Sequence, residues 1–231
     1  MKSIFPLLLS LAAGAQAATT LSPTFVVSTA IPDNSLLGIA DTRAVTSDIH
    51  QITRVEIALT LTGGWNGDLY AYLSHAGGFT VLLNRPGRSL VMLDGSGTAD
   101  MAVVFSDTAT LDIHTMIPAS GAVTGIYQPD ARNVDPGTVL DTSPRSAFLD
   151  SFAGLDPNGD WTLFIADVSP GGTTVLQSWT MTVTGIPEPA TGLLAATGGL
   201  LLLRRRRIHR DFDALSKRPR SRTDKPPSAA P

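Results

Sequence analysis

Residues 146–185 hold the stretch that decides the fold, SAFLDSFAGLDPNGDWTLFIADVSPGGTTVLQSWTMTVTG. Within it, residues 161–167 and 178–185 each place a tryptophan and further apolar side chains on one parity. Alternation with a period of two predicts a strand with one buried face. The turn residues 170–172, Pro-Gly-Gly, separate the two segments, so we expect them to form a hairpin. The side chains on the expected buried parity are Trp161, Leu163, Ile165, Trp179, Met181 and Val183.

Working outward, residues 51–62 show the same alternation over a longer stretch, with Val55, Ile57, Leu59 and Leu61 on one parity. Short apolar runs bounded by glycine, proline, asparagine or aspartate predict further strands, whereas no comparable stretch has helical periodicity. Many short strands without amphipathic helices predict an all-β protein, an antiparallel jelly-roll β-sandwich of about eight strands. The further strands are expected at 24–30, 69–73, 79–83, 101–105 and, inside an otherwise loop-rich segment 107–146, at 123–127.

Charge is distributed unevenly along the 231 residues. Residues 18–186 contain six arginines, no lysine, fifteen aspartates and one glutamate, whereas residues 204–231 contain ten basic and three acidic residues. An acidic body without a continuous basic patch is a poor partner for phosphates, so nucleic-acid binding is not expected. The chain has no cysteine, which excludes disulfides, a thiolate nucleophile and cysteine-based metal sites.

The first seventeen residues, MKSIFPLLLSLAAGAQA, place Lys2 before an apolar run and end on the small residues Ala15 and Ala17 around Gln16. This order is typical of a secretory signal peptide, so residues 1–17 are expected to be removed and the body exported. The alternative is an N-terminal strand or anchor, but the apolar run is too short to span a bilayer of about 30 Å.

The C-terminal region repeats these features in the opposite order. Residues 190–203 are apolar and predict a short transmembrane helix, which four arginines should hold with its C-terminal end in the cytoplasm and the body outside. A basic polar tail follows at 208–231. The triplet before the helix is Pro187, Glu188 and Pro189, and the arginines are Arg204, Arg205, Arg206 and Arg207.

This triplet, helix and arginine cluster, residues 186–207, resemble the PEP-CTERM sorting signal. The resemblance implies an exosortase-type processing enzyme that acts near the triplet and delivers the body to the cell surface or the extracellular matrix. The tail continues about two dozen residues beyond the arginines, further than is usual in that family. A permanent membrane anchor is the alternative.

Three motifs of the body, IPDN at 31–34, GDLYAYL at 67–73 and the stretch 146–185, resemble the P domain (P/Homo B domain) of subtilisin-like proprotein convertases. The resemblance implies that residues 18–185 form one β-sandwich. Because P domains of convertases accompany a catalytic domain, it also implies a separate serine protease as an alternative partner.

No protease motif of the chain's own accompanies this resemblance. The sequence contains neither G-x-S-x-G nor H-E-x-x-H, and no arrangement typical of a Ser-His-Asp triad. We therefore expect no enzyme activity, and we expect the histidines of the body to be surface or turn residues. They are His50, His75 and His114, with His209 in the tail.

Calcium is the candidate cofactor, because aspartates of the body fall in turns and Ca²⁺ prefers carboxylate and backbone oxygens. The alternative is that these side chains cap turns by accepting backbone N–H bonds. Residues 156–160, DPNGD, open like an EF-hand loop but have glycine at the fourth place and no closing glutamate, so an EF-hand is excluded. The candidate calcium ligands are Asp33, Asp68, Asp156 and Asp160.

The leading hypothesis is an exported, non-catalytic surface or matrix protein that binds extracellular polysaccharide or surface proteins through its loops. One rival is an accessory domain that acts beside a serine protease, and another is a membrane-anchored, calcium-dependent binding module. Trp65, between glycines, is open to two interpretations, as a plug packed into the loops or as an exposed platform for sugar stacking.

Overall fold

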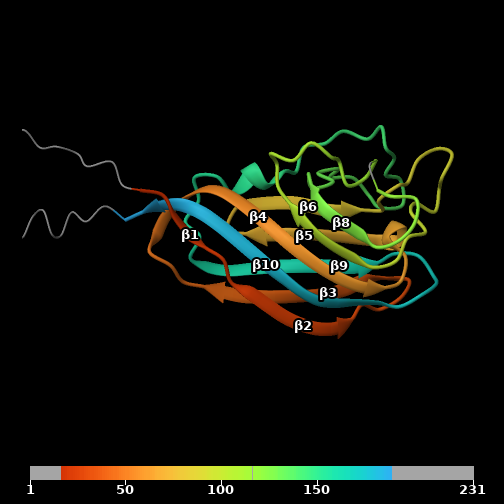
Figure 1. Ribbon diagram of the computed structural model, residues 1–231, viewed down its shortest axis with the longest axis horizontal. Helices are drawn as coiled ribbons and strands as arrows, with labels where there is room; N and C mark the ends of the chain where they lie inside the picture. Colours follow the sequence, from red (N-terminus) through yellow and green to blue (C-terminus); the bar gives the residue numbers. More distant parts are fainter. Residues whose placement is uncertain (1–16, 116, 189–231) are drawn as a thin grey trace, which may run out of the picture. The chain divides into compact units, whose positions relative to one another are not determined.

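The computed structural model describes residues 17–115 and 117–188, which contain ten β-strands and two 3₁₀ turns (Figure 1). The strands alternate buried and exposed side chains along much of their length, as expected for sheets that cover a core on one face. They are β1 Thr19–Leu21, β2 Thr24–Ala30, β3 Ser35–Val45, β4 Ile49–Gly63, β5 Leu69–His75, β6 Gly78–Asn84, β7 Met101–Phe105, β8 Val123–Tyr127, β9 Gly159–Asp167 and β10 Thr174–Pro187. The 3₁₀ turns are η1 Asn66–Asp68 and η2 Leu149–Phe152.

The strands form two sheets (Figure 1). One has the order β1-β10-β4-β7-β8, with β2 also paired to β10, and the other has the order β3-β9-β5-β6. All pairs are antiparallel except β7 and β8, which run parallel. The all-β prediction is confirmed, but ten strands are present where about eight were expected. The jelly-roll connectivity stays a prediction.

The expected hairpin between residues 161–167 and 178–185 is wrong. These segments lie in β9 and β10, which belong to different sheets, and residues 170–172 carry the chain from one sheet to the other. Both strands nevertheless bury the predicted parity, with Trp161 and Trp179 no more than 1% exposed. Alternation with a period of two identifies the buried face of a strand. It does not show whether two such strands are neighbours in one sheet or lie in two sheets that face each other across a core.

β4 is the longest strand and bears out the alternation seen in the sequence. Val55, Ile57, Leu59 and Leu61 are all buried in a single core cluster together with the tryptophans of β9 and β10. β10 pairs with β4 along nearly the whole of both strands. The short apolar runs at 24–30, 69–73, 79–83, 101–105 and 123–127 all lie in strands, as expected.

Besides the three-residue β1, β3 is the strand that the sequence pattern missed. It lies at a sheet edge, with β9 as its sheet neighbour, and its first residues Leu36 and Leu37 are exposed instead of buried. The register to β9 shifts between Ser35 and Ile39, and Gly38 in this bulge has φ +51° and its α-carbon lies against the backbone of Ile165. A bulge of this kind disrupts the alternation from which strands are recognised.

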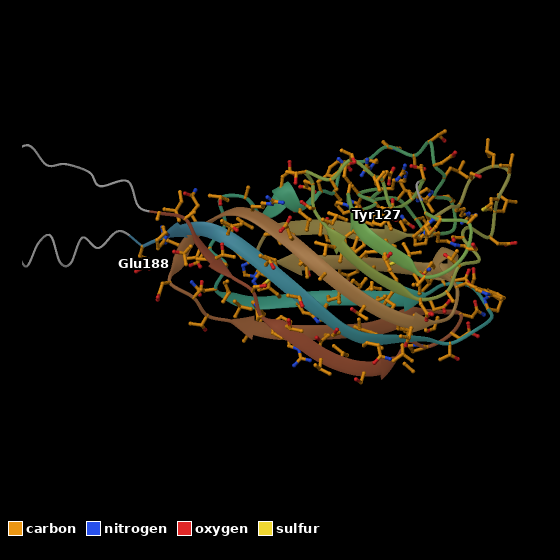
Figure 2. All side chains as sticks on the ribbon, in the orientation of Figure 1. Tyr127 and Glu188 are labelled. Atoms are coloured by element: carbon orange, nitrogen blue, oxygen red, sulfur yellow. The ribbon has the colours of Figure 1, made fainter. Side chains whose placement is uncertain are left out.

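The two ends of the sandwich differ. Thr19 pairs with Gly185, so β1 begins and β10 ends at the same end of the sandwich, where Figure 2 labels Glu188. Figure 2 also labels Tyr127, which is the last residue of β8. We call the opposite end the distal end. Hydrogen bonds between backbone groups join its loops to one another. These loops are residues 31–37, 63–68, 85–98 and 168–173.

Several expectations lie outside the described residues. These are the bulk of the signal peptide, the helix at 190–203, Arg204 to Arg207 and the tail at 208–231. Within residues 17–115 and 117–188, no helix is both long and apolar enough to span a bilayer.

Candidate functional site

The four aspartates expected to bind calcium lie at two ends of the molecule. Asp160 is the second residue of β9, and Asp68 directly precedes Leu69, which pairs with Asp167 at the other end of β9. Asp160 and Asp167 are seven positions apart, which corresponds to about 23 Å of strand. Asp33 lies with Asp68 at the distal end, where its Oδ1 accepts the N–H of Gly171 at 3.0 Å. The four side chains therefore do not form one site.

At the end of the sandwich opposite the distal end, Asp156 caps a turn. Its Oδ1 accepts the backbone N–H of Asn158 at 2.9 Å and the side-chain amide of the same residue at 2.7 Å. The backbone hydrogen bond from Asn158 is the main reason why the pKa of Asp156 lies below its usual value. These contacts match the turn-capping alternative for this residue.

At the distal end, two buried carboxylates each have one oxygen without a hydrogen-bond donor in the described part of the chain. Asp68 is 3% exposed and Asp167 is fully buried, and within the described residues the Oδ2 atom of each has no hydrogen-bond donor. Burial is the main reason why the pKa of Asp167 is raised to about 6. The hydrogen bond from Ser169 N–H and the charge of Arg85 oppose the rise, and the charges of Asp68 and Asp33 add to it. Burial likewise raises the pKa of Asp68, although Arg85 opposes it.

A second group of charged side chains, buried or partly buried, lies in the segments that follow β7 and β8, and we call it the balanced cluster. It consists of Asp112, Asp130, His114, Arg132 and Arg145. The Oδ2 of Asp130 accepts from His114 Nδ1 at 2.7 Å, and its Oδ1 lies 3.3 Å from Arg132 Nη1. Arg132 Nη2 donates to Asp112 Oδ2 at 2.9 Å. Each carboxylate oxygen of both aspartates has at least one donor.

Of the three histidines of the body that were expected to be surface or turn residues, His75 and His114 are buried, although His114 does lie in a turn. His114 is fully buried, and its Nε2 donates to the carbonyl oxygen of Arg88 at 2.8 Å. His75 is 5% exposed, lies between the carbonyl oxygens of Asp156 and Asp160, and stacks on Trp161 at 4.1 Å. Both ring nitrogens of each side chain are engaged, so neither histidine is free to accept a proton from a nucleophile. His50 is exposed as expected, and His209 lies outside the described residues.

Exposed apolar side chains gather in the distal loops. Leu90, Val91, Met92 and Leu93 form a tip in which Ser89 and Met92 pair through their backbones, and Val91 is 96% exposed. Leu36 and Leu37 at the start of β3 and Trp65 before η1 are exposed at the same end. A hollow of about 370 Å³ lies beside the tip. Its lining includes Gly87, Ser89, Met92, His114, Ile117 and Pro118.

Trp65 combines the two roles that the sequence left open. It packs across Gly171, where an added Cβ would come within 2.7 Å of the indole ring, so it plugs the space between two distal loops. It is also 48% exposed, which leaves part of the ring open to solvent.

The first two residues of the triplet that was expected to direct sorting lie at the end of the last strand and directly after it. Pro187 is the final residue of β10, and the N–H of Glu188 donates to the carbonyl oxygen of Asp48 at 3.1 Å. Pro189 lies outside the described residues. A cut after this point would leave every pair of β10 with its neighbouring strands intact.

Sequence reasoning missed Asp167, Asp94 and Arg85 at the distal end and the whole balanced cluster. Asp167 ends the stretch WTLFIAD, and the end of a strand was the available signal. Among residues 17–115 and 117–188, no group of three or more histidine, cysteine, aspartate or glutamate side chains is arranged to hold a metal ion. A metal site there would have to use fewer carboxylates and more backbone oxygens.

Comparison with known proteins gives little similarity. No protein-family model matches the chain, and no curated protein does. Among solved structures, the serine protease of Aeromonas sobria in complex with its chaperone matches 74% of this chain at 16% identity, with a TM-score of 0.43. The same serine protease solved alone matches with 16% identity and a TM-score of 0.41. In both cases the match covers only 28% of the protease chain, and at this similarity it assigns no activity to the present protein.

Proposed function

We propose that the chain is an exported, non-catalytic binding protein whose distal end contacts a protein on the cell surface or in the extracellular matrix. The observation that carries the proposal is the position of the exposed apolar residues. Leu90 to Leu93, Leu36 and Trp65 all lie at the end of the sandwich opposite Glu188, where the chain continues toward the expected sorting signal. A domain attached through one end presents its other end to partners.

The chemistry of the tip favours a protein partner over a polysaccharide. Leucine, valine and methionine side chains gain from burial against another apolar surface, and exposed apolar patches mark sites of protein contact. Sugar recognition would instead depend on an aromatic ring, and Trp65 is the exposed tryptophan at this end.

The test is retention of the purified protein on intact cells of the producing bacterium. Val91→Asp in the tip should reduce retention at least about tenfold, since burying a charge without a partner costs well over 1.4 kcal/mol. The matched control is Val26→Asp, because Val26 is 73% exposed but lies on β2. Equal retention of both variants would contradict the proposal. Loss of retention with Trp65→Ala but not with Val91→Asp would identify a sugar ligand instead.

Export and sorting are part of the same proposal and have their own test. The intact mass of the protein in the extracellular fraction should correspond to a chain that begins after residue 17 and ends near Pro187 to Pro189. A species that keeps Arg204 to Arg207 would favour the permanent anchor. Stoichiometric copurification with a serine protease would favour the accessory role.

A further inference from the structure

The distal end contains a group of carboxylates that outnumber their cations, which we call the distal acidic cluster. It consists of Asp33, Asp68, Asp94 and Asp167 around Arg85. The charges of Asp94 and Asp33 raise the pKa of Asp68, and those of Asp68 and Asp33 raise the pKa of Asp167. The charges of three of the four aspartates oppose the lowering of the pKa of Arg85 by burial. The sandwich itself brings them together, because Leu69 and Ser35 both pair with Asp167.

Arg85 does not neutralise this cluster. Its Nη2 lies 3.6 Å from Asp68 Oδ1, at the limit of an ion pair, while its Nε donates to the carbonyl oxygen of Gly67 at 3.0 Å. The side chain of Ser169 also bonds to Asp68, and the N–H of Ser169 reaches Asp167 Oδ1 at 3.4 Å. These contacts leave the Oδ2 atoms of Asp68 and Asp167 without a donor, although both residues are at least nine-tenths buried.

An ionised carboxylate that is buried without a donor is costly, so such groups pair with cations, bind metals or take up a proton. Two such oxygens in one acidic cluster therefore indicate a missing positive species. The surrounding groups decide its kind. The side chains that make up the cluster contain no histidine or cysteine, which would favour zinc or another transition metal. Surroundings that offer only oxygen ligands suit a hard cation with flexible geometry, for which backbone carbonyl groups of the distal loops would have to supply the further oxygens.

We propose that Asp68 and Asp167 are the carboxylate ligands of a Ca²⁺ site at the distal end, completed by backbone oxygens of the distal loops and by water. Asp33 and Asp94 contribute negative charge at its edge. The assignment keeps Asp68 from the ligands expected from sequence, replaces Asp156 and Asp160 with Asp167, and needs no third carboxylate ligand. It makes no use of the partner proposed above, so the two can fail independently.

Binding here would brace the loops that carry the apolar tip. The carbonyl oxygen of Asp68 accepts Val168 N–H at 2.8 Å, and Gly67 N–H donates to Ser96 at the same distance. Arg85, which touches Asp68, also reaches the carbonyl oxygen of Asp94 directly after the tip. A cation on Asp68 and Asp167 would therefore hold together the start of β5, the end of β9 and the loop that bears Leu90 to Leu93.

The experiment is a calcium titration of the purified full-length chain after treatment with chelator, at about pH 7.5, where both carboxyl groups would be ionised. Calorimetry should give one site per chain with a dissociation constant of about 10⁻³ M or tighter, as in other extracellular calcium modules. At a free concentration ten times that constant, the equilibrium constant for unfolding should fall about elevenfold. Mg²⁺ should bind much more weakly, because it demands a regular octahedral shell.

Variants locate the ion. Asp167→Asn should abolish the calcium response, whereas the matched control Asp160→Asn, an exposed aspartate at the other end of β9, should keep it. If Asp167→Asn does not fold, Asp68→Asn serves in its place. Absence of any calcium response in the unmodified chain would overturn the proposal and favour a shared proton between the two carboxyl groups. An equal response to Mg²⁺, or loss of the response in Asp160→Asn, would also overturn it.

Discussion

The balanced cluster and the distal acidic cluster differ in how the charge of their aspartates is compensated. Each holds two aspartates beneath loops, and of these four Asp112 is partly exposed and the other three are buried. In the balanced cluster, Asp112 and Asp130 are shared among His114, Arg132 and Arg145, and every carboxylate oxygen has a donor. In the distal acidic cluster, Arg85 is the cation beside Asp68. Among the described residues, one oxygen of Asp68 and one of Asp167 have no hydrogen-bond donor.

The difference separates a structural network from a candidate ion site. A buried network whose carboxylate oxygens all have donors needs no further cation to compensate their charge. A buried cluster with unpartnered oxygens is complete only when something positive joins it. Counting donors for each buried oxygen therefore distinguishes the two better than counting aspartates, which are numerous throughout this body.

The largest effect is expected from breaking the balanced cluster. Asp130→Asn removes the charge shared by His114 and Arg132 and leaves both buried side chains short of an anionic partner. Loss of one partner from a buried ionic group costs about 3–5 kcal/mol of unfolding free energy. Urea unfolding measures it, with the exposed Asp150→Asn as the control. A loss below about 1 kcal/mol would show that the cluster adds little to stability.

The opposite sign is expected in the distal acidic cluster. The pKa of Asp167 is raised from 3.8 to about 6 in the folded chain, so the folded state binds more protons than the unfolded state between these values. Stability from this group is present at low pH and is lost as the pH rises toward 6.

With chelator present, Asp167→Asn should therefore become more stable relative to the unmodified chain as the pH rises from about 4 to about 7. A shift of this size corresponds to roughly 3 kcal/mol. Chemical denaturation of both proteins across this range measures the difference, in which the other titrating groups cancel. A constant difference would contradict the assignment of uncompensated charge to Asp167.

The sequence predicts the strands of this fold better than their partners. The alternation in residues 51–62 locates β4 because one face of the strand meets the core. The pairing of β9 and β10 was wrong because a buried parity does not say which sheet a strand joins. β3 was missed because Leu36 and Leu37 are apolar but exposed.

Of the two proposed calcium ligands, the sequence identified one and missed the other, because it does not show how strands pair. Asp68 stands out in the sequence as a turn aspartate before a strand. Its partner Asp167 lies about a hundred residues away, and only the register of β5 against β9 brings the two together. Single-sequence patterns identify oxygens suited to calcium, but the choice among fifteen aspartates of the body depends on pairing and burial that emerge from the fold.

A smaller effect is expected at His114 of the balanced cluster. Burial disfavours its imidazolium, but the hydrogen bond and the charge of Asp130 and the carbonyl oxygen of Arg88 outweigh burial and the repulsion from Arg132, so the pKa of His114 is raised. A raised pKa means that this stabilisation is complete below about pH 6.5 and is lost as the pH rises through the folded-state value.

His114→Gln should therefore be less stable than the unmodified chain by about 2 kcal/mol at about pH 6, the range of a hydrogen bond to a charged group, with the gap narrowing at higher pH. Thermal unfolding over this range measures it, and His50→Gln, which changes an exposed histidine, should follow the unmodified chain. A gap that does not depend on pH would mean that His114 is neutral between its two acceptors.

The smallest effect is expected from Asp94, which lies at the edge of the distal acidic cluster and is exposed. Water and salt screen an exposed charge, and even at contact in water two unit charges interact by only about 1 kcal/mol. Asp94→Asn should therefore weaken Ca²⁺ binding by no more than about fivefold. It should leave the free energy of unfolding within about 0.5 kcal/mol. Its effect should also disappear in about 1 M salt, where the Debye length falls to about 3 Å. Calorimetry at low and high salt tests this, and a tenfold loss that persists at high salt would make Asp94 a direct ligand and enlarge the site beyond Asp68 and Asp167.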